Sequence, residues 1–181
     1  MLLVGLIINM LYVQSCGGDH SVLKMETYTS ADGGFSINMP SDPKRTVKVI
    51  TTPFGKQATT FIEWKPDNIS INKFKLFQVS FTDCPASLMT DSSGRQRILD
   101  SAINMRVKDF ADIDLETYTI NFNGIEGRAF IFEVKDNNNI AIVKQCIANH
   151  KLYDVTVVLK KNFATNKEVH EFFNSFQVLY R

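Results

Sequence analysis

The stretch "ETYTINFNGIEGRAFIFEVKDNNNIAIVKQCIANHKLYDVTVVLK", residues 116–160, decides the fold. Residues 116–122 alternate polar and apolar side chains with period two, which is typical of a half-buried strand. Asn123-Gly124 follows, and this pair is the strongest short hairpin signal because both residues tolerate a positive φ. Similar strand patterns cover residues 127–135, 140–148 and 152–160, with turns at 136–139 and 149–151. The sequence therefore predicts an antiparallel meander of four strands.

Upstream of the meander, alternation of the same kind predicts more strands. The segments are residues 35–39, which Pro40 ends, then 46–52, 56–65 and 74–83. Pro53-Phe54-Gly55 is turn chemistry, since proline presets φ and glycine supplies a positive φ. Residues 46–65 are therefore predicted to form a hairpin.

Residues 94–110 change to helical spacing. Two adjacent apolar stripes form one broad face, as expected for a helix that lies on a sheet. Oxygens of residues 91–93 can cap its start. The basic side chains lie outside the apolar face and are predicted to be solvated, with Asp100 and Asp109 as partners. They are Arg95, Arg97, Arg106 and Lys108.

A second helix is predicted near the C-terminus. Thr165 and Glu168 have the spacing of a capping box. The residues after them place four apolar side chains on one stripe at i, i+3, i+4 and i+7, namely Val169, Phe172, Phe173 and Phe176. Runs of hairpins with two separated helices predict an antiparallel α+β fold rather than a parallel one.

The N-terminus predicts the location of the protein. Residues 1–15 are almost entirely apolar, but the run is shorter than the roughly 20 residues of a membrane-spanning helix. It ends in Val13-Gln14-Ser15-Cys16, which resembles a bacterial lipobox. We therefore expect residues 1–15 to be a lipoprotein signal peptide and Cys16 to be the acylated residue. Two or three acyl chains anchor a protein firmly, because each buried methylene contributes about 0.8 kcal/mol.

Two other interpretations of this run are open: a cleavable signal without lipid, and a buried N-terminal helix. With the lipobox interpretation, residues 16–30 are a flexible tether and residues 31–181 are one domain. The bilayer is then one partner, and the domain faces the periplasm or the cell surface.

Composition limits the class of partner. Lys plus Arg total 20 and Asp plus Glu total 19, so the net charge of +1 predicts no nucleic-acid partner. The 14 Phe residues lie mostly in strand patterns and are expected in the core. Besides Cys16, Cys84 and Cys146 either form a disulfide, which an oxidising compartment permits, or remain two buried free thiols.

No constellation of catalytic or metal-binding residues is evident. The chain has three histidines, His20, His150 and His170, and none has a ligand at metal spacing. The acidic residues Asp109, Asp112, Asp114 and Glu116 lack the pattern of a calcium loop. We predict no metal and no cofactor. Cys84 would need a neighbouring base to act as a nucleophile; His150 or His170 could lie near it in space, but the sequence gives no support for either.

An ordered series of motifs resembles the PsbP/Mog-like family. It consists of "TPFGK" at residues 52–56, "FTDCP" at 81–85, "NGIEGRAF" at 123–130 and "EFFNSFQVL" at 171–179. The resemblance runs from Gly33 to Leu179 and is nearest to the bacterial branch of secreted proteins and lipoproteins. It implies a curved antiparallel sheet with helices on both faces, a three-layer sandwich. Relatives act as extrinsic subunits of photosynthetic membranes or bind a small GTPase, which implies a binding or accessory domain.

Two main functions follow from the sequence, and a third option is a structural subunit of a surface complex, which an uncovered edge strand would indicate. The first is a non-catalytic accessory or binding domain, anchored to the cell envelope, with an unknown envelope protein or component as partner. The second is a small-molecule carrier or a hydrolase that uses a pocket against the Phe-rich sheet. A deep apolar pocket with convergent polar groups favours the second, whereas a solid core with an exposed apolar patch favours the first.

Overall fold

The computed structural model describes residues 23–67, 73–107, 115, 117–134 and 138–180. Cys16, residues 1–15 and the acidic cluster Asp109, Asp112, Asp114 and Glu116 lie outside the described residues. Among the described residues, no helix has the length and apolar character needed to cross a bilayer.

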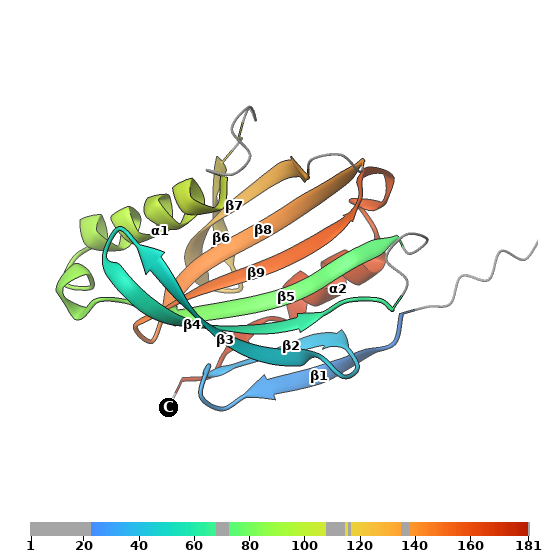
Figure 1. Ribbon diagram of the computed structural model, residues 1–181, viewed down its shortest axis with the longest axis horizontal. Helices are drawn as coiled ribbons and strands as arrows, with labels where there is room; N and C mark the ends of the chain where they lie inside the picture. Colours follow the sequence, from blue (N-terminus) through green and yellow to red (C-terminus); the bar gives the residue numbers. More distant parts are fainter. Residues whose placement is uncertain (1–22, 68–72, 108–114, 116, 135–137, 181) are drawn as a thin grey trace, which may run out of the picture.

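A seven-stranded antiparallel sheet forms the centre of the molecule (Figure 1). Its order is β3-β4-β5-β9-β8-β7-β6, so the chain builds one half, crosses over, and returns to place β9 beside β5. The strands are β3 (Lys44–Thr52), β4 (Gly55–Trp64), β5 (Phe74–Asp83), β6 (Thr117–Phe122), β7 (Ile125–Val134), β8 (Asn139–Ala148) and β9 (Lys151–Lys160). The predicted hairpin and the predicted four-stranded meander are both confirmed.

Left-handed turn residues join the meander strands. Asn123 and Gly124 have φ of 51° and 90° between β6 and β7, and Asn149 and His150 have φ of 48° and 58° between β8 and β9. Two consecutive positive φ angles define the type I′ turn, whose twist matches that of the strands it joins. These turns fix the register in which alternate side chains reach opposite faces of the sheet.

A three-stranded antiparallel sheet lies on one side of the large sheet. It has the order β1-β2-β10 and consists of β1 (Met25–Ser30), β2 (Phe35–Pro40) and β10 (Gln177–Val178). The predicted flexible tether at residues 16–30 is therefore wrong for its last part, because residues 25–30 pair with β2 along their full length. The folded domain begins by Met25 rather than at residue 31.

The two helices lie on opposite faces of the seven-stranded sheet. The helix α2 (Lys167–Ser175) buries Val169, Phe172 and Phe173 in the main core, together with side chains of β2, β5 and β9. Phe172 contacts Phe77 edge to face, with ring centroids 5.0 Å apart. The predicted apolar stripe is confirmed, but the predicted capping box is not, because Asn166 caps the helix and accepts from the Glu168 backbone N–H.

The helix α1 (Ser92–Val107) covers the other face. It packs Ile103 against Phe130 and Val143, and Ile98 and Leu99 against Ile147. Two short 3-10 turns, η1 (Ala86–Leu88) and η2 (Lys161–Phe163), precede the helices. The chain is thus an antiparallel α+β protein, as predicted.

Candidate functional site: a cavity beneath helix α1

A cavity of about 240 Å³ lies between α1 and the sheet. Residues of the β3–β4 hairpin, the end of β5, the middle of α1 and the start of β9 form its lining. The apolar part of the lining includes Ile50, Phe54, Phe61, Ile98, Met105 and Leu152. The site therefore combines segments that are far apart in sequence, and it exists only in the folded chain.

The position of α1 explains the space. Its buried side chains Ile98, Leu99 and Ile103 pack toward β7 and β8, on one half of the sheet. At its start, a Cβ on Gly94 would lie 2.1 Å from the Leu88 carbonyl oxygen, so only glycine permits this approach. The small side chains Ser101 and Ala102 face the cavity and do not fill it.

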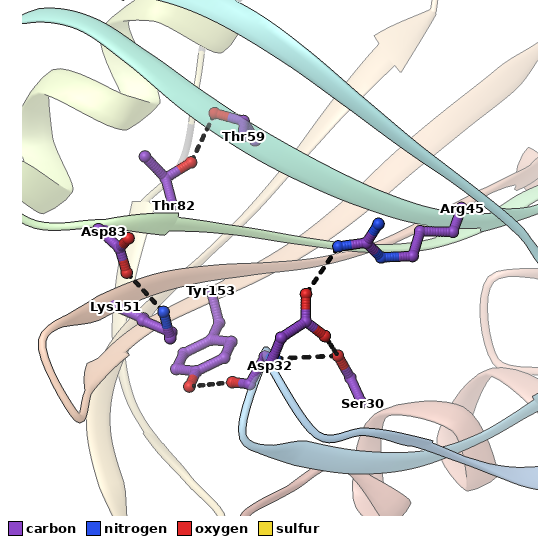
Figure 2. A network of polar contacts seen from close by, with 9 residues as sticks. Ser30, Asp32, Arg45, Thr59, Thr82, Asp83, Lys151 and Tyr153 are labelled. Carbon is purple, nitrogen blue, oxygen red and sulfur yellow. Dashed lines mark hydrogen bonds and ion pairs between the residues drawn. The ribbon is translucent and has the colours of Figure 1, made fainter.

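Hydroxyl groups at the hairpin side of the cavity hold its wall in place. Thr59 on β4 and Thr82 on β5 are hydrogen-bonded at 2.6 Å, as Figure 2 shows. At the β3–β4 turn, the Thr52 hydroxyl donates to the Gly55 carbonyl at 2.8 Å and accepts from the Phe54 N–H at 3.1 Å. The hydrogen bonds fix the position of the Phe54 backbone beside the cavity.

An ion pair lies in the lining on the β9 side. A guanidinium nitrogen of Arg106 donates to Asp154 Oδ2 at 3.1 Å. The Asp154 side chain is 12% exposed and that of Arg106 is 30% exposed. The prediction of a solvated Arg106 is therefore wrong, because this arginine lies in the cavity lining and pairs with a strand of the sheet.

Buried polar atoms without a partner gather on the α1 face of the sheet. Among the described residues they belong to Gln78, Asn139, Gln145, Asp154 and Thr156. Register places Ser80, Asp154 and Gln145 side by side across β5, β9 and β8. Buried polar groups are nearly always hydrogen-bonded, so such a group calls for an explanation such as a bound water or ligand.

The two cysteines are free thiols on different faces of the sheet. Cys84 lines the cavity, and burial raises the pKa of its thiol from 9.0 to about 11. Cys146 is fully buried opposite Tyr153 in the main core, and burial raises the pKa of its thiol to about 12. Both shifts disfavour the thiolate, which is the nucleophilic form of cysteine.

Neither of the two described histidines lines the cavity, although the His150 backbone carbonyl accepts from the N–H of the lining residue Cys84 at 2.8 Å. His150 lies in the β8–β9 turn and His170 is exposed on α2, whereas His20 lies outside the described residues. Over the described ranges, no group of three His, Cys, Asp or Glu side chains is arranged to hold a metal ion.

Further polar contacts connect the cavity wall with the small sheet (Figure 2). Asp83, which follows Thr82 in the lining, pairs with Lys151. The Tyr153 hydroxyl donates to the Gly33 carbonyl at 2.7 Å, and Arg45 on β3 pairs with Asp32 at 2.7 Å. The β1–β2 turn is thereby fixed to the large sheet.

Comparisons with known proteins define the fold. No protein-family model and no curated protein sequence matches the chain. Among solved structures, cyanobacterial PsbP (CyanoP) from Synechocystis sp. PCC 6803 is similar over 92% of this chain and 98% of its own, with a TM-score of 0.51 and 12% identity. A protein of unknown function from Pseudomonas aeruginosa, PA94, described as a putative regulator, covers 81% of this chain and 90% of its own, with a TM-score of 0.37 and 8% identity.

The fold is therefore that of a PsbP-like α+β domain, as the sequence motifs predicted. At 12% identity the similarity to CyanoP concerns the fold alone.

Proposed function

We propose that this protein is a non-catalytic binding domain, anchored to the bacterial cell envelope, that holds a small, largely apolar molecule in the cavity beneath α1. The observation that carries the proposal is the cavity itself, with apolar walls and polar groups from α1, β4, β5 and β9 around it. Ligand sites are typically concave, mostly apolar and supplied with a few polar groups. We also infer that the domain is a three-layer sandwich, because α1 and α2 cover opposite faces of the seven-stranded sheet.

Binding without catalysis is favoured by the chemistry of the lining. A hydrolase needs a nucleophile with an adjacent base. Cys84 is the thiol in the lining, and its raised pKa keeps it protonated at neutral pH. Arg106 and Asp154 already neutralise each other. We therefore favour a protein that binds its ligand without chemical change over a hydrolase.

The anchor in this proposal is acylated Cys16. The chain between Cys16 and Met25, where β1 begins, spans at most roughly 30 Å when fully extended. An acylated Cys16 would thus keep the domain close to the bilayer. Replacing Cys16 with Ala is expected to move the protein from the membrane fraction to the soluble fraction, and mass spectrometry of the native protein is expected to find acyl mass on residue 16. Persistent sedimentation of the variant with membranes would mean that the anchor lies elsewhere.

The binding function is tested by filling the cavity. Ser101→Phe places a ring into the lining, whereas Asn104→Phe places the same ring on the exposed side of α1. Protein purified from its own membranes is analysed for small molecules by native mass spectrometry. We expect a bound compound with the parent and with Asn104→Phe, and none with Ser101→Phe. A parent protein that carries no compound would contradict the proposal.

A second candidate, a protein partner, is favoured by one observation at the sheet edge. Strand β3 is one of the two outer strands of the large sheet, and its Val47 and Val49 are 54% and 69% exposed. An edge strand can pair with an extended segment of another chain. Crosslinking at native membranes followed by purification is expected to yield one reproducible partner, which Val49→Lys should weaken. If Val49→Lys captures the same partner in the same amount as the parent protein, strand β3 is not the surface that binds it.

A further inference from the structure

The outer edge of strand β3 is open along most of its length. On one side β3 pairs with β4, and on the other side its backbone makes no hydrogen bond to a described residue. Six consecutive residues, Lys44–Val49, are all exposed. An outer strand presents a row of unpaired N–H and C=O groups, which a strand of another chain can pair with.

The charge of β3 has one sign. The strand carries Lys44, Arg45 and Lys48 and has no acidic residue. Arg45 is neutralised within the protein, because its guanidinium points to the Asp32 carboxylate in the β1–β2 turn and pairs with it at 2.7 Å (Figure 2). The two lysines are therefore the charges that an added strand would meet.

Neither lysine is paired with a carboxylate in the described part of the chain. Glu63 on β4 lies opposite Lys44 in register, but it pairs with Lys65 at 3.0 Å instead. The Lys48 ammonium lies 5.6 Å from the centre of the Phe61 ring, a contact that leaves its charge uncompensated. The edge of β3 thus keeps two positive charges in water.

The two faces of β3 differ in chemistry. Successive side chains of a strand point to opposite faces of its sheet. Lys44 and Lys48 share a face with Ile50, which lines the cavity beneath α1. Val47 and Val49 lie on the opposite face, where they are 54% and 69% exposed. A strand added to this edge would meet two amines on one face and two valines on the other.

We propose that the edge of β3 binds an extended segment of a partner protein in which acidic and apolar residues alternate. The backbone of the segment pairs with β3. Its carboxylates lie beside Lys44 and Lys48, and its apolar side chains cover Val47 and Val49. This inference rests on the second candidate function, a protein partner at this edge, and names the chemistry of that partner.

The same charges disfavour a second copy of β3 as the occupant. Two β3 strands placed edge to edge would bring the lysines and arginine of both copies close together. Like charges on neighbouring strands are destabilising, and lysine on an edge strand is a common means of preventing self-association. A segment with carboxylates experiences attraction at the same positions, and complementary charge also speeds its encounter with the edge.

The test uses three fluorescently labelled peptides of equal length. The first alternates Glu and Val, the second alternates Lys and Val, and the third has the composition of the first with its glutamates consecutive. Binding to the protein, purified from its own membranes in a neutral detergent, is measured by fluorescence anisotropy. We expect the first peptide to bind at least about tenfold more tightly than the other two, and to bind more weakly at high salt.

Two variants and one modified peptide make the assignment specific. Lys48→Glu should weaken binding of the Glu-Val peptide at least about tenfold and strengthen that of the Lys-Val peptide. Lys167→Glu, at the exposed start of α2, changes the net charge equally and should leave both affinities unchanged. A Glu-Val peptide that is methylated at its backbone nitrogens has no N–H to donate and should not bind.

Three results would overturn the acidic partner. They are a Glu-Val peptide that binds no more tightly than the Lys-Val peptide, an equal loss of affinity in Lys48→Glu and Lys167→Glu, and no binding by any peptide. Undiminished binding of the methylated peptide would overturn the pairing of strands.

These outcomes are distinguishable from failure of the candidate function itself. If a native partner is crosslinked and Val49→Lys weakens its capture, the edge of β3 remains the docking surface and only the chemistry assigned to the partner is wrong. If capture is the same with Val49→Lys, the candidate function fails, and this inference fails with it. Ligand binding in the cavity beneath α1 is tested separately and does not depend on either result.

Discussion

Cys146 illustrates how a single buried residue can make the stability of the folded protein depend on pH. It lies on β8 with no exposed surface, opposite Tyr153 on β9. Burial raises the pKa of its thiol from 9.0 to about 12, and burial also raises the pKa of Tyr153 above its ordinary value of 10.0. The folded protein therefore retains these protons at a pH where the unfolded chain has released them.

The stability of the protein in alkaline solution is expected to depend on the Cys146 thiol. Above about pH 9 the unfolded state binds fewer protons than the folded state, so the free energy of unfolding falls as pH rises toward about 12. Below about pH 9 both states hold the thiol proton and this contribution is fully present. Urea unfolding at pH 8 and pH 10 is expected to give a lower free energy at pH 10. In Cys146→Ala the difference between the two pH values should shrink by about 1 kcal/mol.

Because Cys146→Ala also leaves a cavity, its stability is lower at both pH values, and the quantity compared is the difference between them. A difference equal to that of the parent would mean that the thiol does not carry the effect.

At the scale of elements, two adjacent residues at the start of α2, Thr165 and Asn166, are candidates for the N-cap of this helix. The Asn166 side chain accepts from the Glu168 N–H at 3.2 Å, whereas the sequence pattern favoured Thr165. Asn166→Ala is expected to lower the free energy of unfolding by about 1 kcal/mol, the usual cost of losing an N-cap. Thr165→Ala, its matched control, should change it by less than about 0.5 kcal/mol. If urea unfolding shows a larger loss of unfolding free energy for Thr165→Ala than for Asn166→Ala, then Thr165 caps the helix, as the capping box predicted.

Strands and hairpins were predictable because their signals are local. Period-two alternation and turn residues such as Asn123-Gly124 act within a few positions of each other. The role of Arg106 was not predictable from α1 alone. Its partner Asp154 comes into reach only because β9 returns to pair with β5, and that pairing depends on the order of the whole sheet. The sequence raised the possibility of a pocket against the sheet, but its position beneath α1 and the residues that line it could not be predicted for the same reason.

At the scale of the whole molecule, the three-stranded sheet joins both ends of the described chain. Strand β1 pairs with β2 over its full length, and β10, which follows α2, pairs with the other edge of β2. The sequence did not indicate β1, because residues 25–30 carry only two large apolar side chains, Met25 and Tyr28. Tyr28 packs near Phe35, with ring centroids 6.4 Å apart, so the strand is defined by its partner rather than by its own pattern.

Removal of β1 tests whether it belongs to the domain. A chain that begins at Gly17 keeps β1, and a chain that begins at Ala31 lacks it. We expect the shorter chain to lose about 2 kcal/mol or more of unfolding free energy, comparable to the loss of one buried side chain. Urea unfolding of both chains provides the measurement. Equal stability would mean that residues 25–30 contribute nothing and that the domain starts at residue 31 after all.

The position of β1 bears on how a ligand enters and leaves the cavity. In Figure 1 the chain enters β1 at one end of the molecule, while α1 and the β3–β4 turn lie toward the other. If Cys16 carries a lipid, the bilayer is attached at the end where β1 begins, and the end of the molecule that holds the cavity is the more distant one. Exchange would then take place with solutes dissolved in the surrounding compartment rather than by extraction from the lipid phase, and occupancy would follow their aqueous concentration.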